Sequence, residues 1–127
     1  MAEETVAVDI NATPDVLWGM LGDFEGIGGF FPGIESVVIE EDDRVLNLAG
    51  MEIRERLISR DDESSTLVYS IVDGVPIESH EATVTVSASG DGSHVTWVVD
   101  ASPDEMADLM QSVYQQSLEA LKSHVEG

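Results

Sequence analysis

One long helix is predicted near the end of the chain by the stretch SPDEMADLMQSVYQQSLEALKSH, residues 102–124. Ser102 and Glu105 form a capping box, whose side chains satisfy free N–H groups of the first turn, and Pro103 suits the first helical position. At about 1.5 Å per residue this helix is ~33 Å long. Its apolar residues form a stripe wide enough to lie across a concave sheet: Met106, Leu109, Met110, Val113, Ser117, Leu118 and Leu121.

Upstream of this helix the apolar residues recur with period two, which predicts β-strands. The first strand, Thr5–Ile10, places Val6, Val8 and Ile10 on one face. Short turns rich in Gly, Asp and Ser separate six further strands, at residues 36–40, 45–48, 51–59, 66–73, 79–87 and 95–101. Turns this short cannot hold crossover helices, so the predicted sheet is antiparallel.

Two short helices are expected after the first strand. Thr13 suits the N-cap and Pro14 the first helical position of a helix that runs to about Gly22. The segment Phe24–Ile34 contains four glycines and can hold at most a second short helical piece. The chain is therefore expected to be one α+β domain over residues 1–127. Its seven-stranded antiparallel sheet wraps the long helix, and residues 26–33 form the mouth of an apolar pocket between them.

The charge of the chain limits its partners. Against 26 Asp and Glu residues there are 5 Lys and Arg, which gives a formal net charge of −21 at pH 7. Such a surface repels phosphate backbones and anionic lipid, so no nucleic-acid binding is expected. The carboxylates are spread from Glu3 to Glu126 without a block, which favours a solvated, self-repelling surface, as in a salt-adapted host, over a specific acidic site.

Several kinds of site are excluded or disfavoured by the sequence. The chain has no cysteine, which excludes disulfides, thiolate metal sites and a cysteine nucleophile. Its three histidines are separated, and no phosphate-binding or dinucleotide motif occurs, so neither a metal nor a cofactor is expected. No apolar run approaches the ~20 residues of a membrane span and no signal peptide is visible, which predicts a cytoplasmic protein without integral membrane contact.

The sequence leaves the oligomeric state open, and the protein is either a monomer or a dimer.

Strand alternation places three polar side chains on the inward face of the sheet. Glu55 falls among Ile53 and Leu57, whereas Arg54 and Arg56 point outward. Tyr69 and His80 take inward positions on the two following strands, and Val95 and Trp97 do so on the last strand.

Each of the three polar residues has two interpretations. A carboxylate in an apolar cavity has a raised pKa and can act as an acid or base near neutrality. Alternatively, Glu55 is a structural acid that pairs with Arg54, Arg56 or Arg44, or bonds to Tyr69. His80 is either a proton shuttle or ligand donor, or a rim residue with one nitrogen in water. Tyr69 is either a ligand contact or an amphipathic core residue.

Several strings resemble, in order and spacing, the polyketide cyclase/dehydrase-like branch of the START and Bet v 1-like (SRPBCC) superfamily. They are Asn11-Ala-Thr-Pro-Asp-Val-Leu-Trp18, Phe31-Pro-Gly-Ile34, Arg54-Glu-Arg-Leu57, Tyr69-Ser-Ile71 and Leu118-Glu-Ala-Leu-Lys122. The resemblance covers essentially the whole chain and implies a helix-grip fold. The family often has Trp where this chain has Phe30 or Phe31, and the connection from Asp100 to Pro103 is short.

The resemblance also implies a set of pocket residues. Plant abscisic acid receptors are distant members, and their glutamate in the matching Glu-Arg-Leu string corresponds to Glu55. Their ligand-gating loops are not recognisable here, so a hormone-receptor role does not carry over. The candidate catalytic residues are Glu55, His80 and Tyr69. The pocket-lining positions of those receptors correspond to Leu48, Ile53, Tyr69, Ile71, Ile77, His80, Val113 and Ser117. The candidate ligand-binding residues beyond these are Val95, Trp97, Met110, Phe30 and Phe31. As alternatives, Trp97 is a core residue and Ser117 fills space in the core.

The sequence leaves three functions open. In a cyclase or dehydratase, Glu55 would abstract a proton α to a carbonyl while Tyr69 or His80 donates to the developing oxyanion. In a non-catalytic carrier or sensor, the same groups would orient a small hydrophobic molecule or a lipid. A protein-interaction or lipid-chaperone role would require an exposed apolar patch around Ile27, Phe30, Phe31 and Ile34.

Overall fold

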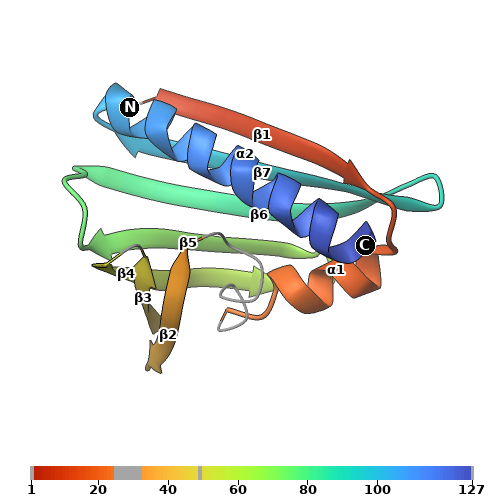
Figure 1. The fold of residues 1–127 in the computed structure, drawn as a ribbon, viewed down its shortest axis with the longest axis horizontal. Helices are drawn as coiled ribbons and strands as arrows, with labels where there is room; N and C mark the ends of the chain where they lie inside the picture. Colours follow the sequence, from red (N-terminus) through yellow and green to blue (C-terminus); the bar gives the residue numbers. More distant parts are fainter. Residues whose placement is uncertain (1, 25–32, 49, 127) are drawn as a thin grey trace.

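The computed structural model describes residues 2–24, 33–48 and 50–126, and all that follows refers to these residues. They form seven strands and two helices, shown in Figure 1. In chain order the elements are β1 (Ala2–Ile10), α1 (Pro14–Leu21), β2 (Ile34–Glu40), β3 (Asp43–Leu48), β4 (Met51–Asp61), β5 (Thr66–Asp73), β6 (Ser79–Ser89), β7 (Gly92–Ser102) and α2 (Asp104–Glu126).

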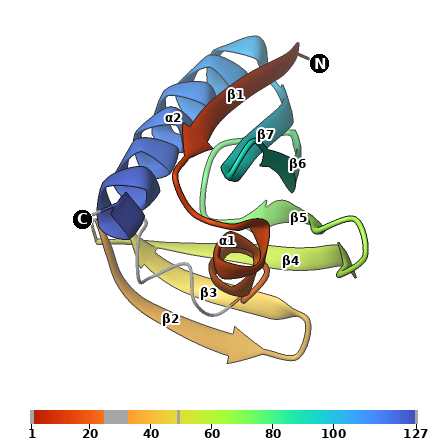
Figure 2. The same ribbon diagram turned by 90° about the vertical axis from the view of Figure 1, so that its right-hand side faces the viewer.

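The strands form one antiparallel sheet in the order β1-β7-β6-β5-β4-β3-β2. From β2 to β7 each strand pairs with its neighbour in sequence, and β1 pairs with β7, where Val6 lies opposite Trp97. Figure 2 shows the sheet curving from β1 round to β2, with α2 along the open side of the curve. The predicted seven-stranded antiparallel sheet and long C-terminal helix are therefore confirmed.

β3 begins at Asp43, two residues earlier than the sequence pattern indicates. The turn before it is tight, because Glu41 adopts a left-handed conformation with φ of 58° and Glu40 pairs directly with Asp43. This turn brings Arg44 into the strand, opposite Glu55 of β4. Arg44 therefore shares the inward face of β3 with Leu46, since side chains two residues apart point the same way.

Both helix starts differ in detail from the capping patterns in the sequence. In α1, Pro14 occupies the first turn as expected, but the Thr13 side chain makes no capping hydrogen bond. At α2, the Ser102 hydroxyl donates to Glu78 across the sheet, and the carbonyl of Pro103 accepts the first helical bonds. Ser102 thus ends β7 and does not cap the helix. The second short helix, expected within 24–34, falls largely outside the described residues.

The core lies between the concave face of the sheet and α2, with α1 against one end. The buried face of α2 consists of Ala107, Met110, Tyr114, Ser117, Leu118 and Leu121. The predicted stripe included Leu109, but this side chain is 52% exposed because the helix is turned so that Tyr114 faces the sheet. Among the described residues, no helix combines the length and apolar character needed to cross a membrane.

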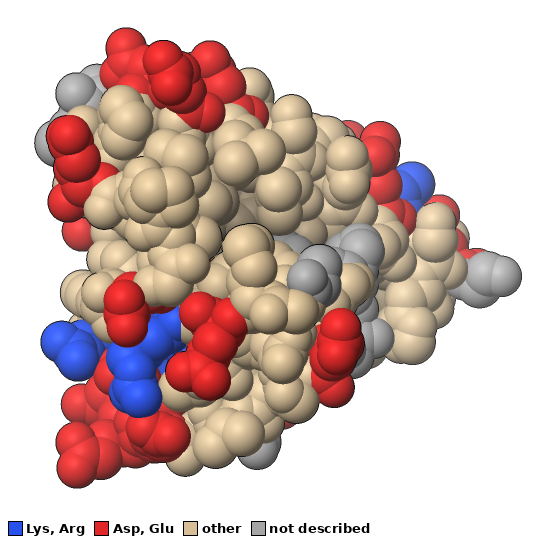
Figure 3. Space-filling model, turned by 60° about the vertical axis from the view of Figure 1, so that its left-hand side comes forward, with Lys and Arg blue, Asp and Glu red and all other residues tan. Residues whose placement is uncertain are grey.

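All five basic side chains form ion pairs with carboxylates. The pairs are Arg44 with Glu55, Arg54 with Glu40 and Asp43, Arg56 with Asp43, Arg60 with Asp62, and Lys122 with Glu126. Figure 3 shows Lys and Arg lying against acidic side chains beside a broad face without charge. The excess of carboxylates therefore leaves the surface strongly negative.

Candidate ligand cavity

A cavity of about 470 Å³ lies between α2 and the β3–β5 part of the sheet. This volume falls within the range of small-molecule sites in proteins, roughly 300–1,000 Å³. Of the described residues that line it, all but Glu55 and Tyr114 have apolar side chains. The predicted residues in this lining are Leu48, Ile53, Glu55, Ile71, Met110 and Val113, and the others are Leu46, Met51, Val75, Pro76, Met106, Leu109 and Tyr114.

Glu55 is held by a buried ion pair with Arg44. Arg44 Nε donates to Glu55 Oε1 at 2.7 Å, and only 2% of Arg44 and 5% of Glu55 is exposed. Arg44 also donates through Nη1 to the Phe24 carbonyl at 2.8 Å. Its guanidinium carbon lies 4.0 Å from the centre of the Phe24 ring and 4.8 Å from that of Tyr69. These contacts use both the charge and the flat faces of the guanidinium.

Two opposing effects act on the Glu55 carboxyl. Burial disfavours its charged form and raises its pKa, while the Arg44 charge and hydrogen bond lower it. Burial is the larger effect, so the pKa lies above the ordinary value for glutamate. The carboxyl is therefore a stronger base than a surface glutamate, although Arg44 weakens it.

His80 is on β6, behind the cavity wall, and its ring bonds to groups of β5 and α2. The Ile71 amide N–H donates to His80 Nδ1 at 3.0 Å, and His80 Nε2 lies 2.9 Å from the Tyr114 hydroxyl. Burial lowers the pKa of His80 to about 4, so the imidazole is neutral at pH 7. Since Nδ1 accepts a hydrogen bond, the proton of the neutral ring is on Nε2, which donates to the Tyr114 oxygen.

Comparison with known proteins identifies the family. A family model described as polyketide cyclase / dehydrase and lipid transport matches residues 1–126. The chain belongs to this family. No curated protein matches the chain in sequence. Membership of this family supports a role in binding a hydrophobic ligand.

Solved structures show how widely this fold is shared. The protein XoxI from Bacillus cereus is 28% identical with a TM-score of 0.92, and the match covers 98% of this chain and 95% of that chain. A START superfamily protein from Mycobacterium smegmatis is 15% identical with a TM-score of 0.82, covering 98% and 97%. Ginseng major latex-like protein 151 from Panax ginseng is 20% identical with a TM-score of 0.74, covering 95% and 97%. The last two share the fold alone.

The other predicted site residues of this polyketide cyclase/dehydrase family member that the structure describes lie outside the lining of the large cavity. Trp97 is covered by Tyr114, whose ring stacks on it with centroids 4.2 Å apart and an angle of 6°. His80 is separated from the cavity by the same Tyr114 ring. Val95 and Ser117 are fully buried in the core, and Ile77 packs against its edge. Phe30 and Phe31, with most of the expected mouth at 26–33, fall outside the described residues.

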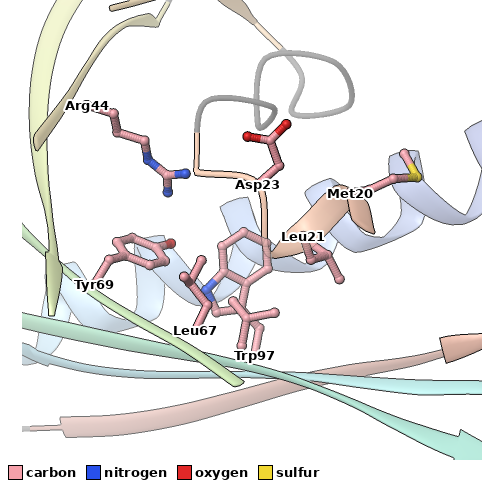
Figure 4. Close-up of a pocket in the computed structure, with 8 residues that line it drawn as sticks. Met20, Leu21, Asp23, Arg44, Leu67, Tyr69 and Trp97 are labelled. Carbon is pink, nitrogen blue, oxygen red and sulfur yellow. The ribbon is translucent and has the colours of Figure 1, made fainter. Parts of the chain in front are cut away.

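Tyr69 lies beside a second, much smaller void of about 10 Å³, drawn in Figure 4. The figure shows Tyr69 and Arg44 on one side of this void and Asp23 and Leu21 near the end of α1. The buried Tyr69 hydroxyl has no hydrogen-bond partner at normal distance among the described residues, and burial raises its pKa well above the ordinary value. The void has room for roughly one water molecule, which suits this hydroxyl but not a ligand.

The sequence interpretation missed Tyr114 and left Arg44 as one of three possible partners of Glu55. Arg54 and Arg56 bind Asp43 on the outer face, which leaves Arg44 for Glu55. Continuing the alternation of Leu48 and Leu46 by two residues would have placed Arg44 inward. Tyr114 lies four residues from both Met110 and Leu118, on the buried face of the helix. Among the described residues, no cluster of His, Asp or Glu is arranged to hold a metal ion.

Proposed function

We propose that the protein binds a small, mostly apolar molecule that carries a carbonyl group, in the cavity between α2 and the sheet. The observation that carries this proposal is the lining, which is apolar apart from Glu55 and Tyr114 among the described residues. Apolar surface buried in such a cavity contributes about 25 cal/mol per Å², and a few placed polar groups fix the orientation of the guest.

A carrier or sensor role is favoured over catalysis by the Arg44 contact. The guanidinium neutralises Glu55 and engages Oε1, which weakens the carboxylate as a base. The second candidate, cyclisation or dehydration with Glu55 as general base, is supported by the burial that raises the pKa of Glu55. The two functions differ in whether Glu55 removes a proton α to the ligand carbonyl.

Binding can be tested with Prodan, a fluorescent naphthalene that carries a dimethylamino group and a propionyl ketone. We expect the wild type to bind Prodan with a dissociation constant in the micromolar range, about −8 kcal/mol. Val113→Trp places a large side chain in the cavity and is expected to weaken binding at least roughly tenfold, because the ring occupies the ligand volume. Fluorescence titration measures both affinities.

Ser112→Trp is the matched control, because Ser112 is the exposed neighbour of Val113 on α2. This variant is expected to bind Prodan like the wild type. Equal binding by the Val113 and Ser112 variants, or no binding by the wild type, would reject the cavity as the ligand site.

The catalytic candidate can be tested by hydrogen exchange at the ligand. The propionyl ketone of Prodan has two α-protons, which a general base exchanges for deuterium in D₂O. If Glu55 is a base, the wild type accelerates this exchange and Glu55→Gln reduces it by roughly 10²-fold or more while still binding Prodan. We expect no acceleration by the wild type, since Arg44 holds the carboxylate. Mass spectrometry of the extracted ketone measures deuterium uptake, and an acceleration that is lost in Glu55→Gln would establish the catalytic role.

A further inference from the structure

A chain of hydrogen bonds fixes the direction of one donor at the cavity wall. The Ile71 amide can only donate, so His80 Nδ1 must accept, and the ring proton is on Nε2. His80 Nε2 then donates to the Tyr114 hydroxyl oxygen at 2.9 Å. Tyr114 is thereby the acceptor in its bond to His80, and its own O–H proton remains to be donated elsewhere.

The packing of the Tyr114 ring limits the groups that can accept a hydrogen bond from its O–H. The ring stacks on Trp97, and its edge contact with His80 has centroids 6.4 Å apart. Three charged or polar groups among the described residues act on its hydroxyl: Glu55, Arg44 and Tyr69. Tyr69 acts as a donor toward the Tyr114 oxygen, since burial raises the pKa of Tyr114 and the Tyr69 contact lowers it, and Tyr69 therefore does not take the Tyr114 proton. Tyr69 forms no hydrogen bond at normal distance in the described part of the chain, and Tyr114 lines the ligand cavity. The Tyr114 O–H is therefore a donor available to a guest.

The described residues of the cavity give a guest carboxylate no free cation to pair with. The cation nearest to the cavity, Arg44, is bonded to Glu55 and to the Phe24 carbonyl and is covered by two aromatic rings. A guest carboxylate at Tyr114 would be a third buried charge beside an ion pair that is already balanced, and a buried charge without a partner of its own is strongly unfavourable. A neutral carbonyl oxygen accepts from Tyr114 without this cost.

We infer that Tyr114 is the donor that selects the ligand, that His80 is the positioning residue that directs this donor, and that the ligand is a neutral ketone or ester and not a free fatty acid. This inference rests on the proposed binding of a carbonyl compound in the same cavity. It adds which residue recognises the carbonyl and which class of lipid is rejected.

Two matched probes test the role of Tyr114. Prodan has the ketone, and 2-dimethylamino-6-propylnaphthalene has a methylene group in its place. We expect Tyr114→Phe to weaken Prodan binding about tenfold, the effect of one hydrogen bond, and to leave binding of the second probe unchanged. Phenylalanine keeps the stacking on Trp97, so the fold is retained. The emission of bound Prodan should shift to shorter wavelength, because its carbonyl loses a donor.

His80 is tested with the same two probes. His80→Met removes the Nε2–H donor, so the Tyr114 hydroxyl can turn its proton away from the guest. We expect the preference for Prodan over the second probe to fall several-fold, with an emission shift in the same direction as in Tyr114→Phe. A structural role alone would weaken both probes equally and would contradict the positioning role. If His80→Met does not fold, the Tyr114→Phe comparison still decides whether Tyr114 is the donor that selects the ligand.

The rejection of free acids is tested by displacement of Prodan from the wild type. Methyl decanoate is expected to displace Prodan at a concentration at least roughly tenfold below that of decanoate at pH 7.5, because only the acid introduces a charge. Equal displacement would overturn the exclusion of fatty acids. If neither naphthalene probe binds, the proposed function fails. If both bind equally well, or if Tyr114→Phe keeps the preference, only this inference fails.

Discussion

Arg44→Met is expected to destabilise the fold by about 3–5 kcal/mol, because it leaves the Glu55 carboxyl buried without its partner. The cost is large since Glu55 is 5% exposed, and it is hydrogen-bonded to no other described residue. The variant also loses the hydrogen bond to the Phe24 carbonyl and the ring contacts of the guanidinium. Urea denaturation at pH 7 measures the change in the free energy of unfolding.

Two controls separate the stability cost of leaving the Glu55 carboxyl unpaired from the cost of removing any arginine. Arg44→Met combined with Glu55→Leu is expected to lie within about 1 kcal/mol of the wild type or above it, because neither charge remains buried. Arg54→Met removes a partly exposed arginine that pairs with Asp43 and Glu40, and it is expected to cost about 1 kcal/mol or less. A single Arg44 variant as stable as the Arg54 variant would contradict this account.

The loss of folding stability in Arg44→Met should also depend on pH, and it should be smaller at low pH. Without Arg44 only the burial effect remains on the Glu55 carboxyl, so its folded-state pKa rises further above the unfolded value. A raised carboxyl pKa favours the folded state at low pH, and this contribution is lost as the pH rises. The difference in stability between wild type and variant is therefore expected to shrink as the pH falls from neutrality.

Acid is expected to destabilise the protein through His80 by up to about 3 kcal/mol. The folded-state pKa of His80 is about 4, against 6.5 for the free side chain, because burial disfavours the imidazolium. Between these two values the unfolded chain binds more protons than the folded one. The contribution of His80 is thus fully present above pH 6.5 and is lost as the pH falls to 4. A protonated ring would also place an Nδ1–H against the Ile71 amide N–H.

The measurement compares the wild type with His80→Gln by urea denaturation between pH 7 and pH 4. The free-energy advantage of the wild type over this variant is expected to shrink by up to about 3 kcal/mol over that range. Other titrating groups, Glu55 among them, affect both proteins and largely cancel in the difference. His94→Gln, at an exposed position paired with Asp9, should keep the acid sensitivity of the wild type. A constant difference between wild type and His80→Gln would show that His80 is not the responsible group.

These two residues have a common function in the proposed site. Arg44 pairs with Glu55 and His80 bonds to Tyr114, and both residues lie beside the Tyr69 ring. Both are buried, and neither lines the large cavity. A ligand in the cavity would meet Glu55 and Tyr114. Each of these is hydrogen-bonded to a partner that does not line the cavity.

Local sequence patterns determined the strand order in the chain, the long helix and the inward faces of the strands. Alternation with period two placed Glu55, Tyr69 and His80 inward, and all three are buried. This succeeds because the side chains of a strand alternate between its two faces whatever the strand later packs against. The same regularity supported the resemblance to the family that the whole-chain match then established.

Only the tertiary structure decided which of these inward groups face the ligand cavity. Tyr114 lies between the cavity and both His80 and Trp97, and this depends on how α2 is rotated on the curved sheet. The pairing of Glu55 with Arg44 depends on a tight turn that adds two residues to β3. Tyr114 and His80 are 34 residues apart, so no local pattern could reveal that they meet. The sequence determined which side chains leave water, and the curvature of the sheet around α2 determined which of them meet.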